Sequence, residues 1–102
     1  MIYYVDIDET ICYYKDGDRE YPKAVPDYSR IEKINSLYKK GNVIVYWTAR
    51  GSQTGIDWTD LTIKQLNEWG AKYTSAMVGK PHYDYFICDK ATNSETFFND
   101  DK

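Results

Sequence analysis

The sequence predicts a single α/β domain that is built around a short, mostly parallel sheet. Two observations lead to this class: β-rich apolar runs alternate with segments of helical periodicity, and the 102 residues suffice for one hydrophobic core. A strand, a helix and a second strand in succession form a crossover unit, and such units build parallel sheets. We expect one domain over residues 1–102, with a loose tail at residues 99–102.

The chain begins with a strand and continues into a flap. Residues 2–7 form an apolar, β-rich run that is typical of a strand buried on both faces. Two apolar and aromatic arms follow, Ile11–Tyr14 and Tyr21–Val25, and the Asp16-Gly17 pair lies between them. An Asp-Gly pair between such arms is a hairpin signal, so we expect a β-hairpin flap over residues 11–25.

A helix and a second strand follow the flap. Pro26 and Asp27 predict the start of the helix, and Gly41 predicts its end. The helix should be amphipathic, because four apolar residues share one face: Ile31, Ile34, Leu37 and Tyr38. Residues 43–47 predict the second strand, and residues 48–52 form the loop directly after it.

The second half of the chain repeats the alternation. Asp57 predicts the N-cap of a second helix, and Gly70 predicts its end. The inner face of this helix should carry four apolar residues: Trp58, Leu61, Leu66 and Trp69. We expect a third strand at residues 73–78, a fourth at residues 85–88, and a last short helix that Asn93 caps.

Polar side chains stand where the predicted strands end. They are Asp6, Asp8, Thr48, Lys80 and Asp89. In open α/β sheets the ligand site lies beyond the carboxyl ends of the strands, so these side chains should meet at one edge. This convergence marks the candidate functional site.

The residue types at this edge fit phosphoryl transfer. Asp6 and Asp8 should repel each other, so a positive group should lie with them. With Asp89 they form an oxygen-only ligand set, which suits a hard cation such as Mg²⁺. The Thr48 hydroxyl and the Lys80 amine are natural partners of a phosphate group. A metal, a carboxylate nucleophile, an acid and a lysine are what phosphoryl transfer requires.

The segment Val5-Asp-Ile-Asp-Glu-Thr10 resembles the D-x-D-x-T signature of the haloacid dehalogenase (HAD) superfamily of phosphatases. The other signatures have counterparts in the same order: Thr48 after an apolar strand, Lys80 before the last strand, and Asp89 at its end. The resemblance covers residues 1–91 and implies a three-layer, Rossmann-like HAD core.

The resemblance implies a Mg²⁺-dependent phosphatase with an aspartyl-phosphate intermediate. Asp6 would be the nucleophile. Asp8 would be the general acid for the leaving group and then the general base for water, and its main-chain carbonyl would bind Mg²⁺. Asp89 would complete the metal site that Asp6 and Asp8 begin. An acid at the position of Asp8 favours a phosphatase, or less often a phosphomutase, because dehalogenases lack that acid and ion-pumping ATPases carry Thr there.

Further residues would bind the phosphoryl group and the substrate. Thr48 and Lys80 would hold the transferring phosphoryl group and count among the catalytic residues. Thr10 would shape the turn that orients Asp8, and we assign it to substrate binding together with Ala49 and Arg50. For Arg50, a surface position over the loop is the equal alternative.

Two features set this chain apart from many members of the superfamily. The segments between Thr10 and Thr48 and between Thr48 and Lys80 are too short for a cap domain, so we expect a capless enzyme with an open site. Cys88 stands where many relatives have a second acid. This substitution favours the alternative function, a catalytically weak or inactive domain that is used for binding or assembly.

The composition of the chain limits which binding partners and which cellular compartment we expect. A net charge of −3 and a pI of about 5.0 argue against a protein that coats nucleic acid. Neither a membrane-spanning stretch nor a signal peptide is expected, and two cysteines do not make a disulfide scaffold, so we expect a cytoplasmic protein. The expected partner is a phosphorylated small molecule, with a phosphorylated macromolecule as the alternative; assembly into a homo-oligomer stays open.

Overall fold

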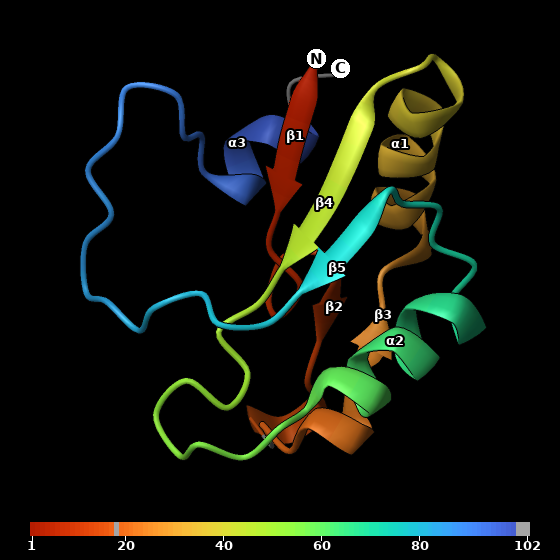
Figure 1. Ribbon diagram of the computed structural model, residues 1–102. Coiled ribbons are helices and arrows are strands. Elements are labelled where there is room, and N and C mark those ends of the chain that lie inside the picture. Colours follow the sequence, from red (N-terminus) through yellow and green to blue (C-terminus); the bar gives the residue numbers. More distant parts are fainter. Residues whose placement is uncertain (18, 100–102) are drawn as a thin grey trace.

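The computed structural model describes residues 1–17 and 19–99, so Asp18 and residues 100–102 of the predicted tail lie outside the description. Three strands form a parallel sheet in the order β1 (Ile2–Val5), β4 (Val43–Trp47) and β5 (Ser75–Met77) (Figure 1). This part of the protein is a small α/β domain, which confirms the coarse fold class that the alternating pattern predicts. The second predicted strand has the same bounds as β4.

Among the described residues, three α-helices connect or follow the strands: α1 (Tyr28–Lys39), α2 (Thr59–Glu68) and α3 (Ser94–Asn99). Helix α1 begins where the sequence predicts, because the Asp27 carboxylate accepts a hydrogen bond of 3.2 Å from the backbone N–H of Arg30. Asn93 caps α3 by accepting a bond of 2.8 Å from the backbone N–H of Glu95. Within the described ranges, every helix is too short or too polar to cross a membrane.

The flap (residues 11–25) contains less β structure than the predicted hairpin. It consists of two short strands that pair antiparallel, β2 (Cys12–Tyr13) and β3 (Val25–Pro26), with 3₁₀ turns η1 (Lys15–Gly17) and η2 (Tyr21–Lys23) between them. The second predicted arm, Tyr21–Val25, is therefore mostly not a strand. The carbonyl of Glu20 accepts the backbone N–H of Lys23 at 2.8 Å, which closes a 3₁₀ turn, and Pro22 has no N–H to offer a strand partner.

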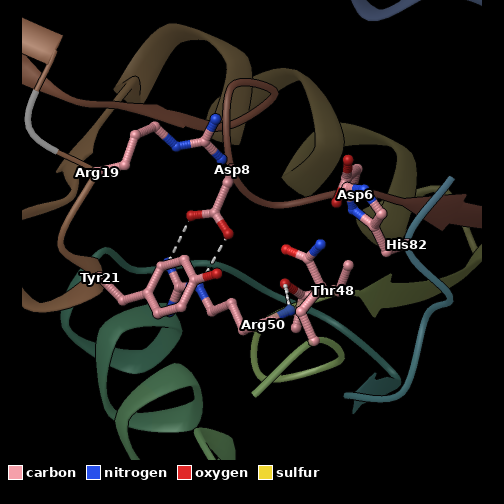
Figure 2. A pocket seen from close by; sticks show the side chains of 9 residues that line it. Asp6, Asp8, Arg19, Tyr21, Thr48, Arg50 and His82 are labelled. Atoms are coloured by element: carbon pink, nitrogen blue, oxygen red, sulfur yellow. Dashed lines mark hydrogen bonds and ion pairs between the residues drawn. The ribbon is translucent and has the colours of Figure 1, made fainter. Parts of the chain in front are cut away.

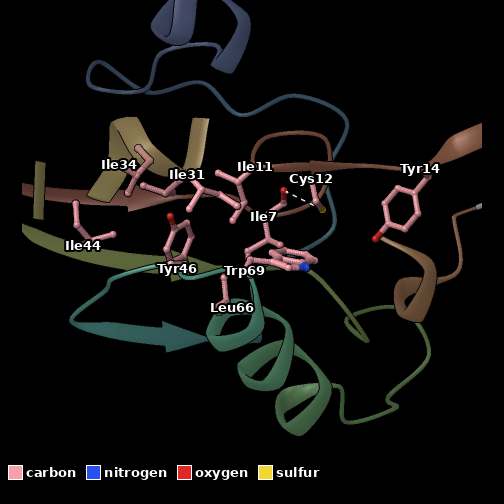
Figure 3. Packing of buried hydrophobic residues seen from close by; sticks show 12 residues of the cluster. Ile7, Ile11, Cys12, Tyr14, Ile31, Ile34, Ile44, Tyr46, Leu66 and Trp69 are labelled. Atoms are coloured by element: carbon pink, nitrogen blue, oxygen red, sulfur yellow. Dashed lines mark hydrogen bonds between the residues drawn. The ribbon is translucent and has the colours of Figure 1, made fainter. Parts of the chain in front are cut away.

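The hydrophobic core lies between the sheet and the helices (Figure 3). Ile44 and Tyr46 of the central strand β4 are fully buried and belong to the same cluster as Ile31 of α1 and Leu66 of α2. Side chains that alternate along a strand point to opposite faces, so these residues define the face that the helices cover. Burial of this face fixes the carboxyl ends of β1 and β4, where the candidate site lies.

The opposite face of the sheet carries exposed apolar side chains: Ile2, Tyr4 and Met77. The reason is topological. The chain passes from β1 to its neighbour β4 and from β4 to its neighbour β5, so both connections run in the same direction across the sheet. Connections between parallel strands are right-handed, so the two connecting helices, α1 and α2, lie on the same face of the sheet. Helix α3 contacts α1, where the Lys33 ammonium donates to the carbonyl of Phe97 at 2.8 Å. The third layer that the family resemblance implies is not seen over the ranges that the structure covers.

The predicted fourth strand at residues 85–88 is wrong. The chain is irregular from residue 78 to residue 93, and Tyr85 and Ile87 are 87% and 95% exposed. Gly79, two residues after β5, has φ +92°, and this left-handed conformation leads the chain away from the sheet. A short apolar run fits a strand, but its pattern alone cannot show whether the chain brings it to a partner edge.

Helix α2 turns a more polar face to the interior than the sequence predicts. Thr62, Gln65 and Leu66 are its buried residues, whereas Leu61 is partly exposed. Buried polar side chains need hydrogen-bond partners. Thr62 and Gln65 find theirs in the loop after β4, at the edge where the predicted functional residues gather.

Candidate active site

A cavity of about 420 Å³ lies at the carboxyl ends of β1 and β4 (Figure 2). Its lining comes from the turn after β1, the flap, the loop after β4 and the segment after β5. The lining residues are Asp6, Asp8, Arg19, Tyr21, Thr48, Ala49, Arg50, Gln53 and His82. Five of the residues that the sequence assigns to catalysis or substrate binding are therefore brought to one cavity.

A tight turn after β1 presents the two aspartates. The carbonyl of Ile7 accepts the backbone N–H groups of Thr10 at 3.1 Å and Ile11 at 2.9 Å, which folds the chain back on itself. Glu9 has φ 60°, a left-handed conformation that residues other than glycine rarely adopt. Because β1 ends at Val5, two residues before the end of the predicted strand, Asp6 stands in this turn together with Asp8.

The Asp6 carboxylate is the more accessible of the two, with 40% of its side chain exposed. One oxygen accepts the backbone N–H of Ile7 at 2.9 Å, and the other lies 3.5 Å from the Lys80 ammonium. Burial of the carboxyl raises the pKa of Asp6, and repulsion from the Asp8 charge raises it further. The positive charge of Lys80 acts to lower this pKa but does not outweigh the burial. A positive group placed near Asp6 would therefore stabilise its charged form.

The Asp8 carboxylate is enclosed, with 11% of its side chain exposed. Arg50 binds it with two hydrogen bonds, from Nε to Oδ2 at 3.0 Å and from Nη2 to Oδ1 at 2.8 Å. The Tyr14 hydroxyl donates a third, of 2.5 Å, to Oδ1. Burial acts to raise the pKa of Asp8, but the hydrogen bonds and charge of Arg50, with the Tyr14 hydroxyl, hold it below its ordinary value.

Arg50 is completely buried, so the alternative of a surface position is wrong. Besides Asp8, its Nη1 group donates to the Thr62 hydroxyl at 3.2 Å and to the Gln65 side-chain carbonyl at 2.6 Å. Its guanidinium carbon lies 4.9 Å from the centre of the Tyr21 ring. Protein groups therefore accept four hydrogen bonds from a side chain that has five N–H donors.

Thr48 and Lys80 follow two neighbouring strands, and the backbone N–H of Lys80 donates to the Thr48 carbonyl at 3.2 Å. The Thr48 hydroxyl is buried and accepts the backbone N–H of Arg50 at 3.1 Å, which holds the loop after β4. The Lys80 ammonium lies 5.9 Å from the ring centre of Trp47 and 5.5 Å from that of Tyr83. These two rings hold the ammonium beside Asp6, so Lys80 reaches the site as the sequence predicts.

Asp89 and Thr10 are not brought to the cavity. Asp89 is exposed in the irregular segment after β5, so the predicted ligand set of Asp6, Asp8 and Asp89 is not assembled. Over residues 1–17 and 19–99, no three acidic, histidine or cysteine side chains gather closely enough to hold a metal ion. Thr10 serves the turn instead, and its carbonyl accepts a bond of 3.0 Å from Arg30.

Sequence reasoning missed the residues that surround the Asp8–Arg50 pair. They are Tyr14, Thr62 and Gln65. Thr62 and Gln65 are three apart on a helix, so they share one face, and both interrupt the apolar residues of that face. A polar pair on an otherwise apolar helix face was the available signal for a buried charged partner. Tyr14 carried no such signal, because aromatic residues are frequent throughout the flap.

Comparison with known proteins supports the fold. No protein-family model matches the chain, and no curated protein matches it. Its structure is similar to the crystal structure of a structural-genomics target from Vibrio cholerae, with a TM-score of 0.83 and 25% sequence identity. The match covers 96% of this chain and 87% of the other. The two proteins therefore share an overall fold.

Proposed function

We propose that this protein is a Mg²⁺-dependent phosphatase of the HAD type, which hydrolyses a phosphate monoester through an aspartyl-phosphate on Asp6. The observation that carries the proposal is the arrangement at the cavity. An accessible carboxylate, Asp6, lies 3.5 Å from the Lys80 ammonium, and a second carboxylate, Asp8, lines the same cavity. The order of these residues along the chain matches the superfamily signatures.

In the first step, an Asp6 oxygen attacks phosphorus, the bond from phosphorus to the ester oxygen breaks, and the departing alkoxide takes a proton from Asp8. In the second step, water gives a proton to the Asp8 carboxylate and attacks the phosphorus of the aspartyl-phosphate. The bond to Asp6 breaks, which releases inorganic phosphate and the free Asp6 carboxylate. Lys80 lies beside Asp6 and would balance the charge of the phosphoryl group in both steps.

The environment of Asp8 fits the second step directly. Arg50 and Tyr14 favour the ionised carboxylate, which is the form that accepts a proton from water. To donate a proton in the first step, Asp8 must be protonated, which requires a change in its contacts with Arg50. Approach of an anionic phosphate ester to the cavity would supply the electrostatic force for that change, because it disfavours a second negative charge.

The donor chemistry at Asp6 fits a magnesium ion in part. The Asp6 carboxylate is accessible and has a raised pKa, and the neighbouring main-chain carbonyl of Asp8 is a further oxygen donor in our proposal. When bound, Mg²⁺ would neutralise charge on the transferring phosphoryl group. Asp89 lies in the irregular segment after β5 and is not part of this donor set in the structure.

The cavity favours a small phosphorylated molecule as the substrate. Its volume of about 420 Å³ falls in the range of small-molecule sites, which is roughly 300–1,000 Å³. Arg19 of the flap and His82 add polar groups to its wall. The flap is the part of the chain placed to cover Asp8, because Tyr14 and Tyr21 contact Asp8 and Arg50.

A binding or assembly role without catalysis is the second candidate. The observation that favours it is the complete engagement of Asp8 by Arg50 and Tyr14, together with the position of Asp89 away from the cavity. A domain of this kind would bind a phosphorylated molecule without turnover.

A phosphatase screen distinguishes the two candidates. A panel of phosphate esters with Mg²⁺ should yield inorganic phosphate, and EDTA should abolish the release. Asp6→Asn should reduce turnover to background, whereas Asp60→Asn, an exposed acid on α2, should leave turnover unchanged. Phosphate binding without release from any ester would support the second candidate and contradict the first.

A further inference from the structure

We propose that Arg50 is a positioning residue, which fixes the orientation of the Asp8 carboxylate and joins the flap to helix α2. The inference rests on the proposed function for its catalytic consequence, but its geometric part stands on contacts alone. It assigns Arg50 a role other than substrate binding.

The contact with Asp8 determines the direction of the carboxylate. Two parallel hydrogen bonds, of 3.0 and 2.8 Å, engage both oxygens, so rotation of the carboxylate would break both at once. The guanidinium is itself held, because Thr62 and Gln65 accept from its Nη1 group. Helix α2 therefore sets the position of Arg50. Arg50 in turn sets that of Asp8, as the two hydrogen bonds between them in Figure 2 show.

The same side chain connects the flap to α2. The Tyr21 ring of the flap packs over the Arg50 guanidinium at 4.9 Å, and the Tyr21 carbonyl accepts a bond of 2.7 Å from the Gln65 side chain. Tyr14, directly after β2 of the flap, donates to the Asp8 oxygen that Arg50 also binds. Three separate segments thus meet at one buried guanidinium.

A substrate-binding role fits these contacts less well. Arg50 is fully buried, and four of its hydrogen bonds end on protein groups. A substrate phosphate would have to displace Asp8 to gain a comparable pair of bonds. Arg19 lines the same cavity with an exposed side chain, and Lys80 lies beside Asp6, so both offer charge without that cost.

Arg50→Lys tests the proposal, because lysine keeps the charge but lacks the planar fork that holds both oxygens. A misplaced Asp8 should matter most where the leaving group needs a proton. We expect kcat/KM for an alkyl ester, glycerol phosphate, to fall by about 10²-fold, within the usual range of acid–base contributions. For p-nitrophenyl phosphate the loss should be under about tenfold, because nitrophenolate departs unprotonated.

Arg30→Lys is the matched control. Arg30 is also a partly buried arginine that pairs with carboxylates, Asp27 and Glu95, but it does not line the cavity. Arg30 also donates to the Thr10 carbonyl of the turn after β1, so its substitution should change kcat/KM by the same factor for both esters. An equal loss for both esters in Arg50→Lys, with a raised KM, would assign Arg50 to substrate binding and overturn the proposal.

Hydrogen exchange tests the geometric part without any turnover. Amides of the flap should exchange faster in Arg50→Lys than in wild type or Arg30→Lys, while amides of β4 should be unchanged. Unchanged exchange in the flap would overturn the link between flap and helix. If the wild-type protein hydrolyses no ester but flap exchange rises as expected, the proposed function fails and the positioning geometry stands.

Discussion

Asp6 and Asp8 stand two residues apart, but their carboxylates bind different cations: Lys80 for Asp6 and Arg50 for Asp8. Both stand in the turn that the Ile7 carbonyl closes with the N–H groups of Thr10 and Ile11, and their pKa values shift in opposite directions. Pairs of titratable groups whose environments differ in this way are typical of sites that divide catalytic roles. Asp6, the more accessible carboxylate, fits a nucleophile, and Asp8, which the buried Arg50 binds with two hydrogen bonds, fits a proton-transfer group.

The Asp8–Arg50 pair should dominate the stability of this end of the domain. Asp8→Asn leaves the buried Arg50 charge uncompensated, which should lower the free energy of unfolding by about 3–5 kcal/mol. The double variant Asp8→Asn/Arg50→Met should lose less than the sum of the single variants, because it removes both charges. Urea denaturation measures each value, and additive losses would contradict the pairing.

The same pair predicts how stability depends on pH. The pKa of Asp8 is lowered in the folded state, so its contribution is present above the unfolded value of about 3.9 and is lost as pH falls through the folded value. The stability gap between wild type and Asp8→Asn should therefore be widest near neutral pH and should narrow as the pH falls below the unfolded value of about 3.9. A gap of constant size would show that the charge of Asp8 does not act in the folded protein.

The two cysteines should differ sharply toward a thiol reagent. Cys12 is buried in the flap, and burial, with the nearby Asp8 charge, raises its pKa to about 12, whereas Cys88 is exposed. Iodoacetamide should modify Cys88 in the native protein and reach Cys12 only after unfolding. Peptide mapping by mass spectrometry measures both sites. Rapid labelling of Cys12 in the native protein would mean that the flap does not pack as described.

Two glycines with positive φ provide a matched test of the loop after β4. A methyl group on Gly51 would clash with the backbone carbonyl of Ile56, whereas one on Gly55 would meet open space. Both substitutions to alanine incur left-handed strain of about 1 kcal/mol, so the additional loss in Gly51→Ala reports the clash. Equal melting temperatures for the two variants would show that the loop does not close on Ile56.

Glu9 should tolerate glycine. Its φ of 60° costs about 1 kcal/mol in a residue with a Cβ, and Glu9→Gly removes that strain while it adds freedom to the unfolded chain. The two effects nearly cancel, so stability should stay within about 1 kcal/mol of wild type. A larger loss would show that the Glu9 side chain itself supports the turn.

The sequence predicts best those elements that local chemistry determines. Asp27 caps its helix, and the run of residues 43–47 becomes a strand with the predicted bounds, because capping and β-rich patterning act over a few residues. The predicted strand at residues 85–88 fails because its partner edge is distant in the chain, and Gly79 turns the intervening segment away.

In the candidate site, too, the local sequence locates some residues, whereas other contacts depend on the tertiary structure. The signature spacing locates Asp6, Thr48 and Lys80, since each follows a strand. It cannot reveal that Arg50 clamps Asp8, because this pair spans 42 positions and depends on how α2 packs. The sequence places Arg50 only near the site, and its hydrogen-bond partners can be identified only from the tertiary structure.

Trapping of the intermediate tests the central claim most directly. The protein is acid-quenched during turnover of a phosphate ester with Mg²⁺, and its peptides are analysed by mass spectrometry. The account predicts a phosphoryl adduct on the peptide that contains Asp6, and no adduct in Asp6→Asn. Sustained turnover with no adduct on that peptide, or with undiminished activity in Asp6→Asn, would contradict it.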